Sequence, residues 1–321
     1  MRSHPAHRWP LFRCSPQYAF QNDTASRARI PGRSRMNGSR ARLLLRQSLQ
    51  KAECNFVASV FDPISARIAD QLGYRSGILA GSVASLSVLG APDLILLTLS
   101  ELVEQARRVC RTMPDFPLIV DADHGYGNAL NVRRAVEDLE AAGVAAITIE
   151  DTDLPLKSDR AGAPELVPLE TGVAKIAAAL DARRDEKLVI IARTSVAALP
   201  EPANLALRCR AYAEAGADAV FLSGAIGQPG LVEVGKSVNC PIVLSSISPA
   251  IADAAQHGVR LVLGGHDPVR QAIAALYDAM LVQARKHGVS DAPDRSSDAG
   301  DLLAKLTLAG QYEAWKTRFL R

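Results

Sequence analysis

One unit recurs eight times between residues 56 and 287: a short apolar segment, a polar turn and a helix-like segment. The apolar segments are rich in β-branched residues, and the segments after them repeat apolar residues at helical spacing. The predicted strands are Phe56–Phe61, Gly77–Ala80, Leu118–Asp121, Ala146–Ile149, Leu188–Ala192, Ala219–Leu222, Pro241–Leu244 and Arg260–Leu263. The predicted helices are Ser65–Leu72, Ser100–Met113, Asn131–Ala142, Glu170–Asp181, Ala203–Ala215, Gly230–Val238, Pro249–His257 and Pro268–His287.

Eight such units predict an α/β fold, a parallel (β/α)₈ barrel of the TIM type with right-handed crossovers. A doubly wound open sheet is the alternative. That fold usually has fewer strands and often a glycine-rich first turn, and no G-x-G-x-x-G follows the first predicted strand. We therefore expect a catalytic barrel over residues 37–289.

Two segments flank the repeated units. Residues 37–53 predict an extra N-terminal helix, and residues 290–321 predict a polar linker and a C-terminal helix. An amphipathic helix beyond a complete barrel needs an apolar partner, so we expect it either to contact another subunit or to pack on its own barrel.

Charge separates the first residues from the rest. Residues 1–35 hold seven Arg and one Asp, whereas residues 36–321 hold 30 basic and 33 acidic residues. We expect residues 1–36 to be disordered or to lie upstream of the true start of translation, with an organellar transit peptide as the alternative. The mildly acidic remainder has no basic stripe for nucleic acid, and no apolar run approaches the length of a membrane span.

The five cysteines are dispersed and form no C-x-x-C pair; they are Cys14, Cys54, Cys110, Cys209 and Cys240. This pattern argues against a zinc site or a disulfide framework and favours a reducing, cytoplasmic location.

Polar residues stand at the ends of the predicted strands, where barrel enzymes carry their active sites. They are Asp62, Ser82, Asp121 with Asp123, Glu150 with Asp151, Arg193, Ser223, Ser245 and His266. Residues i and i+2 of a strand share a face, so Asp121 and Asp123 can point into one cleft and hold Mg²⁺ that keeps several waters. The alternative for this pair is a loop acid followed by a helix N-cap.

The other strand-end residues suggest a substrate with negative charge. Arg193 can pair with a substrate carboxylate or a developing enolate oxygen, or it can form a buried salt bridge with Glu150. His266 can donate or relay a proton, or it can merely precede a helix start. Tyr126 and Asn128 can contact substrate or only pack the loop. No lysine stands at a strand end for Schiff-base chemistry.

Five segments in order resemble the isocitrate lyase/phosphoenolpyruvate mutase superfamily. They are FDPISARIADQLGY (61–74), AGSVASLSVLGAPD (80–93), DADHGYGN (121–128), the run that ends in IED at Asp151, and IIARTS (190–195). HGYGNALN and GGHDPVRQA (264–272) are most similar to the branch that contains the oxaloacetate decarboxylases.

This resemblance implies a lyase for small 2-oxo acids that depends on Mg²⁺, with Mn²⁺ as a substitute, and that forms homotetramers with helix exchange. By motif, Asp121 would bind the metal directly, and Asp123 and Glu150 would bind it through water. Ser82 would bind the carboxylate and carbonyl end of the substrate, and Arg193 would bind the forming enolate. His266 would be the residue distinctive of the branch. Asp93 matches a recurrent acid in the second loop.

The resemblance also implies the reaction, which is decarboxylation of oxaloacetate to pyruvate and CO₂. Isocitrate and 2-methylisocitrate lyases carry a cysteine in a K-[KR]-C-G-H loop, and residues 154–167 lack it. A phosphonopyruvate hydrolase, a 2-alkylmalate or 2-methylisocitrate lyase, and a non-catalytic 2-oxo acid binding protein are the alternatives.

Overall fold

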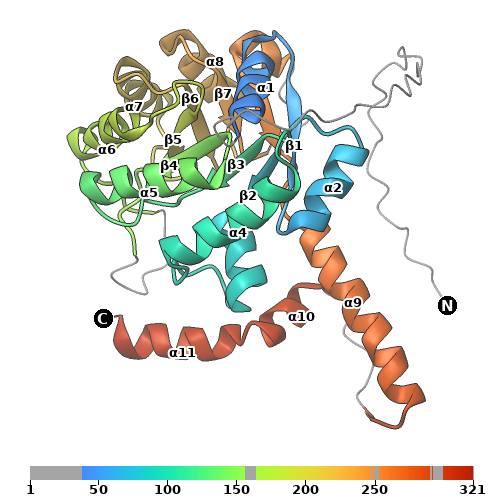
Figure 1. Ribbon diagram of the computed structural model, residues 1–321. Helices are drawn as coiled ribbons and strands as arrows, with labels where there is room; N and C mark the ends of the chain where they lie inside the picture. The colour runs from blue at the N-terminus through green and yellow to red at the C-terminus, as the bar shows by residue number, and fades with distance from the viewer. Residues whose placement is uncertain are drawn as a thin grey trace, which may run out of the picture. The chain divides into compact units, whose positions relative to one another are not determined.

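Eight parallel strands pair in sequence order, and β8 pairs with β1 to close the sheet into a barrel (Figure 1). The computed structural model of the chain describes residues 38–155, 164–246, 248, 253–289, 291 and 299–320. The strands are β1 Asn55–Ser59, β2 Gly77–Leu79, β3 Leu118–Asp121, β4 Ala146–Glu150, β5 Val189–Ser195, β6 Ala219–Ser223, β7 Ile242–Leu244 and β8 Val259–Leu263. The predicted (β/α)₈ barrel is confirmed. Our expectation for residues 1–36 concerns residues outside those described.

Helices alternate with the strands, and side-chain caps fix where several of them begin. The main helices are α1 Ser39–Gln50, α2 Pro63–Gln71, α4 Leu99–Thr112, α5 Ala129–Ala142, α6 Leu169–Ala182, α7 Pro202–Glu214, α8 Gln228–Ser237 and α9 Asp267–Lys286. At the start of α4, Thr98 and Glu101 form a capping box. A box of this kind satisfies amide groups that a helix leaves unbonded at its start.

Three regions of the chain differ from the prediction. A short helix α3 (Gly81–Ala84) and a π-helix η1 (Ser85–Leu89) follow β2. Of the helix predicted over 249–257, the described part is a single 3₁₀ turn, η2 (Ala254–His257), while residues 249–252 lie outside the description. The predicted C-terminal helix is two helices, α10 (Ala299–Leu306) and α11 (Ala309–Phe319), and Leu308 between them has a φ of 57°.

The helix α1 closes the N-terminal end of the barrel. Its Ala41, Leu45 and Leu49 pack in one cluster with inward-facing strand residues such as Ile119 and Ile191. Arg42, which is 1% exposed, donates to Val144 O and Glu140 O and pairs with Asp185 at 2.9 Å. These contacts anchor α1 to the N-terminal end of the barrel. In barrels of this type the opposite, C-terminal end carries the active site.

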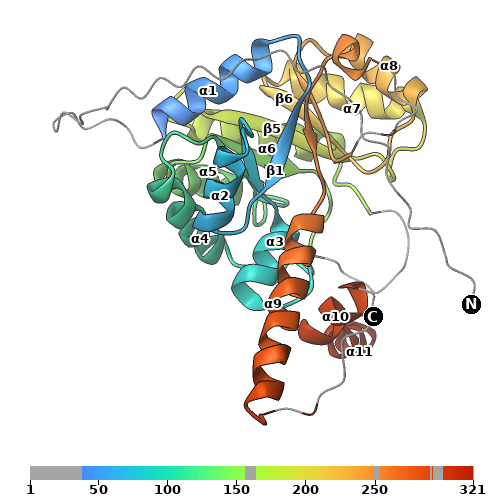
Figure 2. The same ribbon diagram turned by 90° about the vertical axis from the view of Figure 1, so that its right-hand side faces the viewer.

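The last helices leave the barrel. The 20-residue helix α9 extends away from the strands, α10 packs against it, and α11 continues from α10 in a direction away from α9 (Figure 1 and Figure 2). Leu276 and Met280 on α9 are 61% and 62% exposed. In the described part of the chain, no helix combines the length and the apolar character needed to span a bilayer.

Candidate active site

An ion cluster occupies the C-terminal end of strands β3, β4 and β5. Arg193 Nη1 lies 2.5 Å from Asp121 Oδ2, and Arg193 Nε lies 3.2 Å from Glu150 Oε2. The strand register makes this possible, because Glu150 pairs with Arg193 across β4 and β5. Thr148, which pairs with Asp121 across β3 and β4, donates its hydroxyl to Asp121 Oδ1 at 2.7 Å. The structure therefore shows the salt bridge between Arg193 and Glu150, and it places this pair at the C-terminal end of the strands.

Negative charge exceeds positive charge in this cluster. Burial raises the pKa of Asp123 well above its usual range, and the charges of Asp121, Glu150 and Asp93 raise it further, against the opposing effect of Arg193. Burial likewise raises the pKa of Glu150 to about 7, although Arg193 opposes the shift. Carboxylates that are buried together lose this penalty when a cation lies between them.

The donor set fits a hard divalent cation. The carboxylates of Asp121, Asp123 and Glu150 are each less than 9% exposed and supply only oxygen ligands. Among the described residues, no three His, Cys, Asp or Glu side chains form a preassembled set of direct metal ligands. Mg²⁺ suits such a site, because it commonly binds one or two carboxylates directly and keeps several waters.

Asp123 lies in the turn after β3 and presses against the backbone of Gly81. Its φ is 46°, and a Cβ atom placed on Gly81 would lie 2.5 Å from Asp123 Oδ1. Ser82 follows Gly81 in α3 and is half-buried. Asp93 lies in the exposed loop before α4, and its charge acts on Asp123 and Glu150. The loop after β2 and the loop after β3 therefore come together around the carboxylate of Asp123.

His266 occupies the position before α9, and its Nδ1 lies 3.1 Å from Ser59 Oγ. Burial lowers the pKa of His266, while the charge of Asp121 opposes the shift. Sequence reasoning missed Ser59, because the first strand ends there and not at Phe61. Asp62, which we had placed at the strand end, instead caps α2 by accepting from Ser65 N.

The loop residues Tyr126 and Asn128 have different surroundings. Tyr126 has a φ of 63°, and its buried hydroxyl has no hydrogen-bond partner among the described residues. Burial and the charges of Asp123 and Asp121 raise the pKa of this phenol. Asn128 is exposed and caps α5, accepting from Leu130 N at 2.9 Å. The structure therefore gives Asn128 the helix-cap function that we had left open for this loop.

Asp151 points away from the cluster although it follows Glu150. Its Oδ2 accepts from Thr194 Oγ1 at 2.8 Å, Arg208 Nη1 at 2.9 Å and Tyr212 Oη at 2.6 Å. These bonds join β5 and α7 to the end of β4. Asp151 therefore supports the site from behind and does not face its opening.

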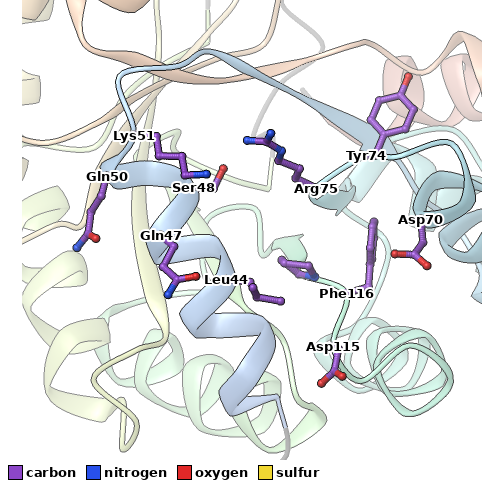
Figure 3. A pocket seen from close by; sticks show the side chains of 11 residues that line it. Leu44, Gln47, Ser48, Gln50, Lys51, Asp70, Tyr74, Arg75, Asp115 and Phe116 are labelled. Carbon is purple, nitrogen blue, oxygen red and sulfur yellow. The ribbon is translucent and has the colours of Figure 1, made fainter. Parts of the chain in front are cut away.

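A cavity of about 570 Å³ lies at the opposite end of the barrel (Figure 3). Its walls come from α1, the residues before β2 and the residues before β3, and they include Lys51, Arg75 and Phe116. All of these segments lie at the N-terminal ends of the strands, so this cavity is separate from the acidic cluster.

The fold and the cluster are those of a (β/α)₈-barrel enzyme. The phosphoenolpyruvate phosphomutase family model matches residues 45–282. The chain therefore belongs to this family, and the superfamily expected from the five segments is confirmed.

The chain is similar to several proteins that are named as enzymes. An oxaloacetate decarboxylase of Pseudomonas fluorescens (strain SBW25) is 45% identical over 290 residues, which cover 89% of this chain and 98% of the relative. The structure of oxaloacetate acetylhydrolase with the inhibitor 3,3-difluorooxalacetate superposes with a TM-score of 0.69 at 28% identity, covering 87% of this chain and 97% of that one. Phosphonopyruvate hydrolase in complex with oxalate and Mg²⁺ gives a TM-score of 0.67 at 31% identity, covering 88% and 99%.

Proposed function

We propose that this protein is a divalent-metal-dependent carboxy-lyase that converts oxaloacetate to pyruvate and CO₂. The observation that carries the proposal is Arg193, a single guanidinium that contacts Asp121 and Glu150 inside the barrel mouth. The name of the 45%-identical relative supports the choice of oxaloacetate among 2-oxo acids.

In this proposal Asp121 would hold Mg²⁺ or Mn²⁺ directly, and Asp123 and Glu150 would hold it through water. The bound ion supplies Lewis-acid polarisation of the 2-oxo group of the substrate. The fit rests on the burial of these carboxylates, which raises the pKa of Glu150 and Asp123, and on the charge of Asp121, which raises both further.

The side chains of the protein account for binding and charge stabilisation. Ser82 and the Tyr126 hydroxyl, which has no hydrogen-bond partner in the described part of the chain, donate to the carboxylate and carbonyl end of the substrate. Cleavage of the bond between C3 and C4 releases CO₂ and leaves its electron pair as an enolate, and Arg193 offsets the charge that develops on the enolate oxygen. Asp93 adds negative charge at the rim of the site.

His266 faces the reacting end of the substrate as a neutral ring. Burial lowers its pKa, and a neutral imidazole whose Nδ1 is paired with Ser59 still offers Nε2 for a hydrogen bond. We assign this bond to the carboxylate that leaves as CO₂, and we assign the C3 proton to solvent.

The direct test measures CO₂ and pyruvate from oxaloacetate with Mg²⁺, with Mn²⁺ and with EDTA, and subtracts the rate without protein. We expect turnover that EDTA abolishes and that Asp121→Ala lacks. Rates equal to the background would end the proposal. Phosphonopyruvate, 2,3-dimethylmalate and 2-methylisocitrate serve as competing substrates, and binding of oxaloacetate without turnover would favour a binding protein.

The assembly and location follow from the same proposal. Exposed apolar residues on α9 and α11, among them Met280 and Phe319, favour a homotetramer built through these helices. Free thiols at Cys110 and Cys209 favour the reducing cytoplasm.

A further inference from the structure

A buried lysine lies behind the acidic cluster. Lys175 on α6 is only 4% exposed, which is rare for lysine because its ammonium group loses hydration. Burial lowers its pKa, while the charges of Asp153, Glu150 and Asp151 oppose the shift. The group does not stand at a strand end and takes no part in the proposed chemistry.

The ammonium group binds the backbone of the turn that carries Asp123. Lys175 Nζ donates to His124 O at 2.9 Å, across 51 positions of sequence. His124 is itself 6% exposed, so water does not compete for this bond. The contact joins α6 to the turn between β3 and α5.

This turn has an unfavourable backbone conformation. Asp123, Gly125, Tyr126 and Gly127 have φ values of 46°, 76°, 63° and 144°. Positive φ is costly for Asp and Tyr, so the surroundings must hold the turn in place.

Three successive carbonyl groups of the turn are each bound. Ala122 O accepts from Gly125 N at 2.8 Å, Asp123 O accepts from Glu150 N at 2.8 Å, and His124 O accepts from Lys175 Nζ. Two of these donors are backbone amides. Lys175 is the donor that a substitution can remove.

We propose that Lys175 is a positioning residue that holds the 122–128 turn. In this position Asp123 can bind, through water, the metal ion that Asp121 would hold directly, and Tyr126 points at the substrate. This inference rests on the proposed function, because it assigns Lys175 to the same metal site. It concerns geometry and not charge, since the ammonium lies behind the turn.

The two effects of removing Lys175 have opposite signs. Loss of a positive charge that interacts electrostatically with Asp153 and Glu150 would make the site more negative and would tighten binding of a divalent cation. Loss of the hydrogen bond to His124 O would let the turn relax and would weaken binding. Residues that orient metal ligands typically change metal affinity by about 10–100-fold when they are replaced.

The experiment measures Mn²⁺ binding without substrate, by electron paramagnetic resonance of free Mn²⁺, in the full-length protein. For Lys175→Met, which keeps the aliphatic stem, we expect affinity to fall about tenfold or more, with a lower kcat on oxaloacetate. Lys175→Arg keeps a cationic donor and is expected to recover most of the affinity. Lys236→Met, at an exposed lysine of α8, is the matched control.

Unchanged or tighter Mn²⁺ binding in folded Lys175→Met would overturn the proposal. If that variant does not fold, Lys175→Gln replaces it, and failure of both to fold would assign Lys175 to stability alone and also overturn the proposal. An inactive wild-type protein would defeat the proposed function instead. Active wild type with variants that match it would defeat only the positioning of Lys175.

Discussion

Arg193 contacts two carboxylates with different atoms of one planar group, and this geometry is specific to arginine. The Nη1 and Nε atoms reach Asp121 and Glu150 respectively. Lysine offers a single point charge on a flexible stem and does not reproduce a forked contact. We expect Arg193→Lys to lower kcat about 100-fold with a smaller change in KM, as for loss of a donor to a developing oxyanion. Steady-state kinetics test this against Arg210→Lys, an exposed position on α7. A variant with normal kcat would contradict it.

A second prediction concerns how the contribution of His266 to kcat/KM depends on pH. Its pKa is lowered from 6.5 by burial, so the neutral ring persists as the pH falls through 6.5 and is lost only below that value. The ratio of kcat/KM between wild type and His266→Gln cancels the other titrating groups. We expect this ratio to stay constant from pH 8 to pH 6.5 and to shrink at lower pH. A ratio that already shrinks above pH 6.5 would show that the pKa is not lowered.

At the scale of elements, α1 is held by buried Arg42, which pairs most closely with Asp185 at 2.9 Å and also with Glu140 at 3.7 Å. Arg42 and Asp185 have side chains only 2% and 3% exposed. Removing Arg42 would leave the buried carboxylate of Asp185 without its cationic partner. We therefore expect Arg42→Met to lower the free energy of unfolding by about 3 kcal/mol at pH 7. Arg40→Met, whose side chain is 48% exposed, should cost less than about 1 kcal/mol. Urea unfolding measures both variants.

The same pair gives the expected pH dependence. Burial alone would raise the pKa of Asp185, but the Arg42 hydrogen bond and the Lys187 amide outweigh it and hold the pKa below 3.8. A carboxyl group with a lowered pKa adds stability above its unfolded pKa and loses it as the pH falls through the folded one. The difference between wild type and Arg42→Met should therefore shrink as the pH falls below about 4. A difference that holds at pH 2 would mean that Asp185 does not supply it.

Elements that carry their own local signal were predictable from sequence. β3 begins and ends as predicted, because four apolar or acidic residues stand between a proline and a glycine-rich turn. The helices α3 and η1 were not predicted. Their start at Gly81 is set by contact with Asp123, a residue 42 positions away, and by burial of Val83 and Ala84. The sequence around residue 81 does not indicate a contact with a residue so far away in the chain. The break at Leu308 likewise lacks the glycine that usually marks it.

The candidate site shows the same division. Asp121, Glu150, Arg193 and His266 were predicted as site residues because barrel enzymes use strand ends, and the structure brings the first three into contact. Thr148 was missed, because its bond to Asp121 depends on the register of β3 against β4. Sequence patterns give the faces of strands but not how neighbouring strands align.

At the scale of the molecule, the apolar residues beyond the barrel predict an assembly. Leu276 and Met280 lie one helical turn apart on α9 and are both more than half exposed. We expect light scattering to show four chains for wild type and a smaller species for Leu276→Asp/Met280→Asp. Leu207→Asp, at a 49%-exposed leucine of α7, should leave the mass unchanged. A wild-type monomer would refute the tetramer.

The lack of a side chain at Gly81 restricts which residues can replace it during evolution. Alanine adds only a Cβ, and at this position that atom would collide with Asp123 Oδ1. Every other replacement includes the same atom, so no gradual series of intermediates leads away from glycine. In a saturation library selected for activity, position 81 should be as intolerant as the acids, although its residue carries no reactive group.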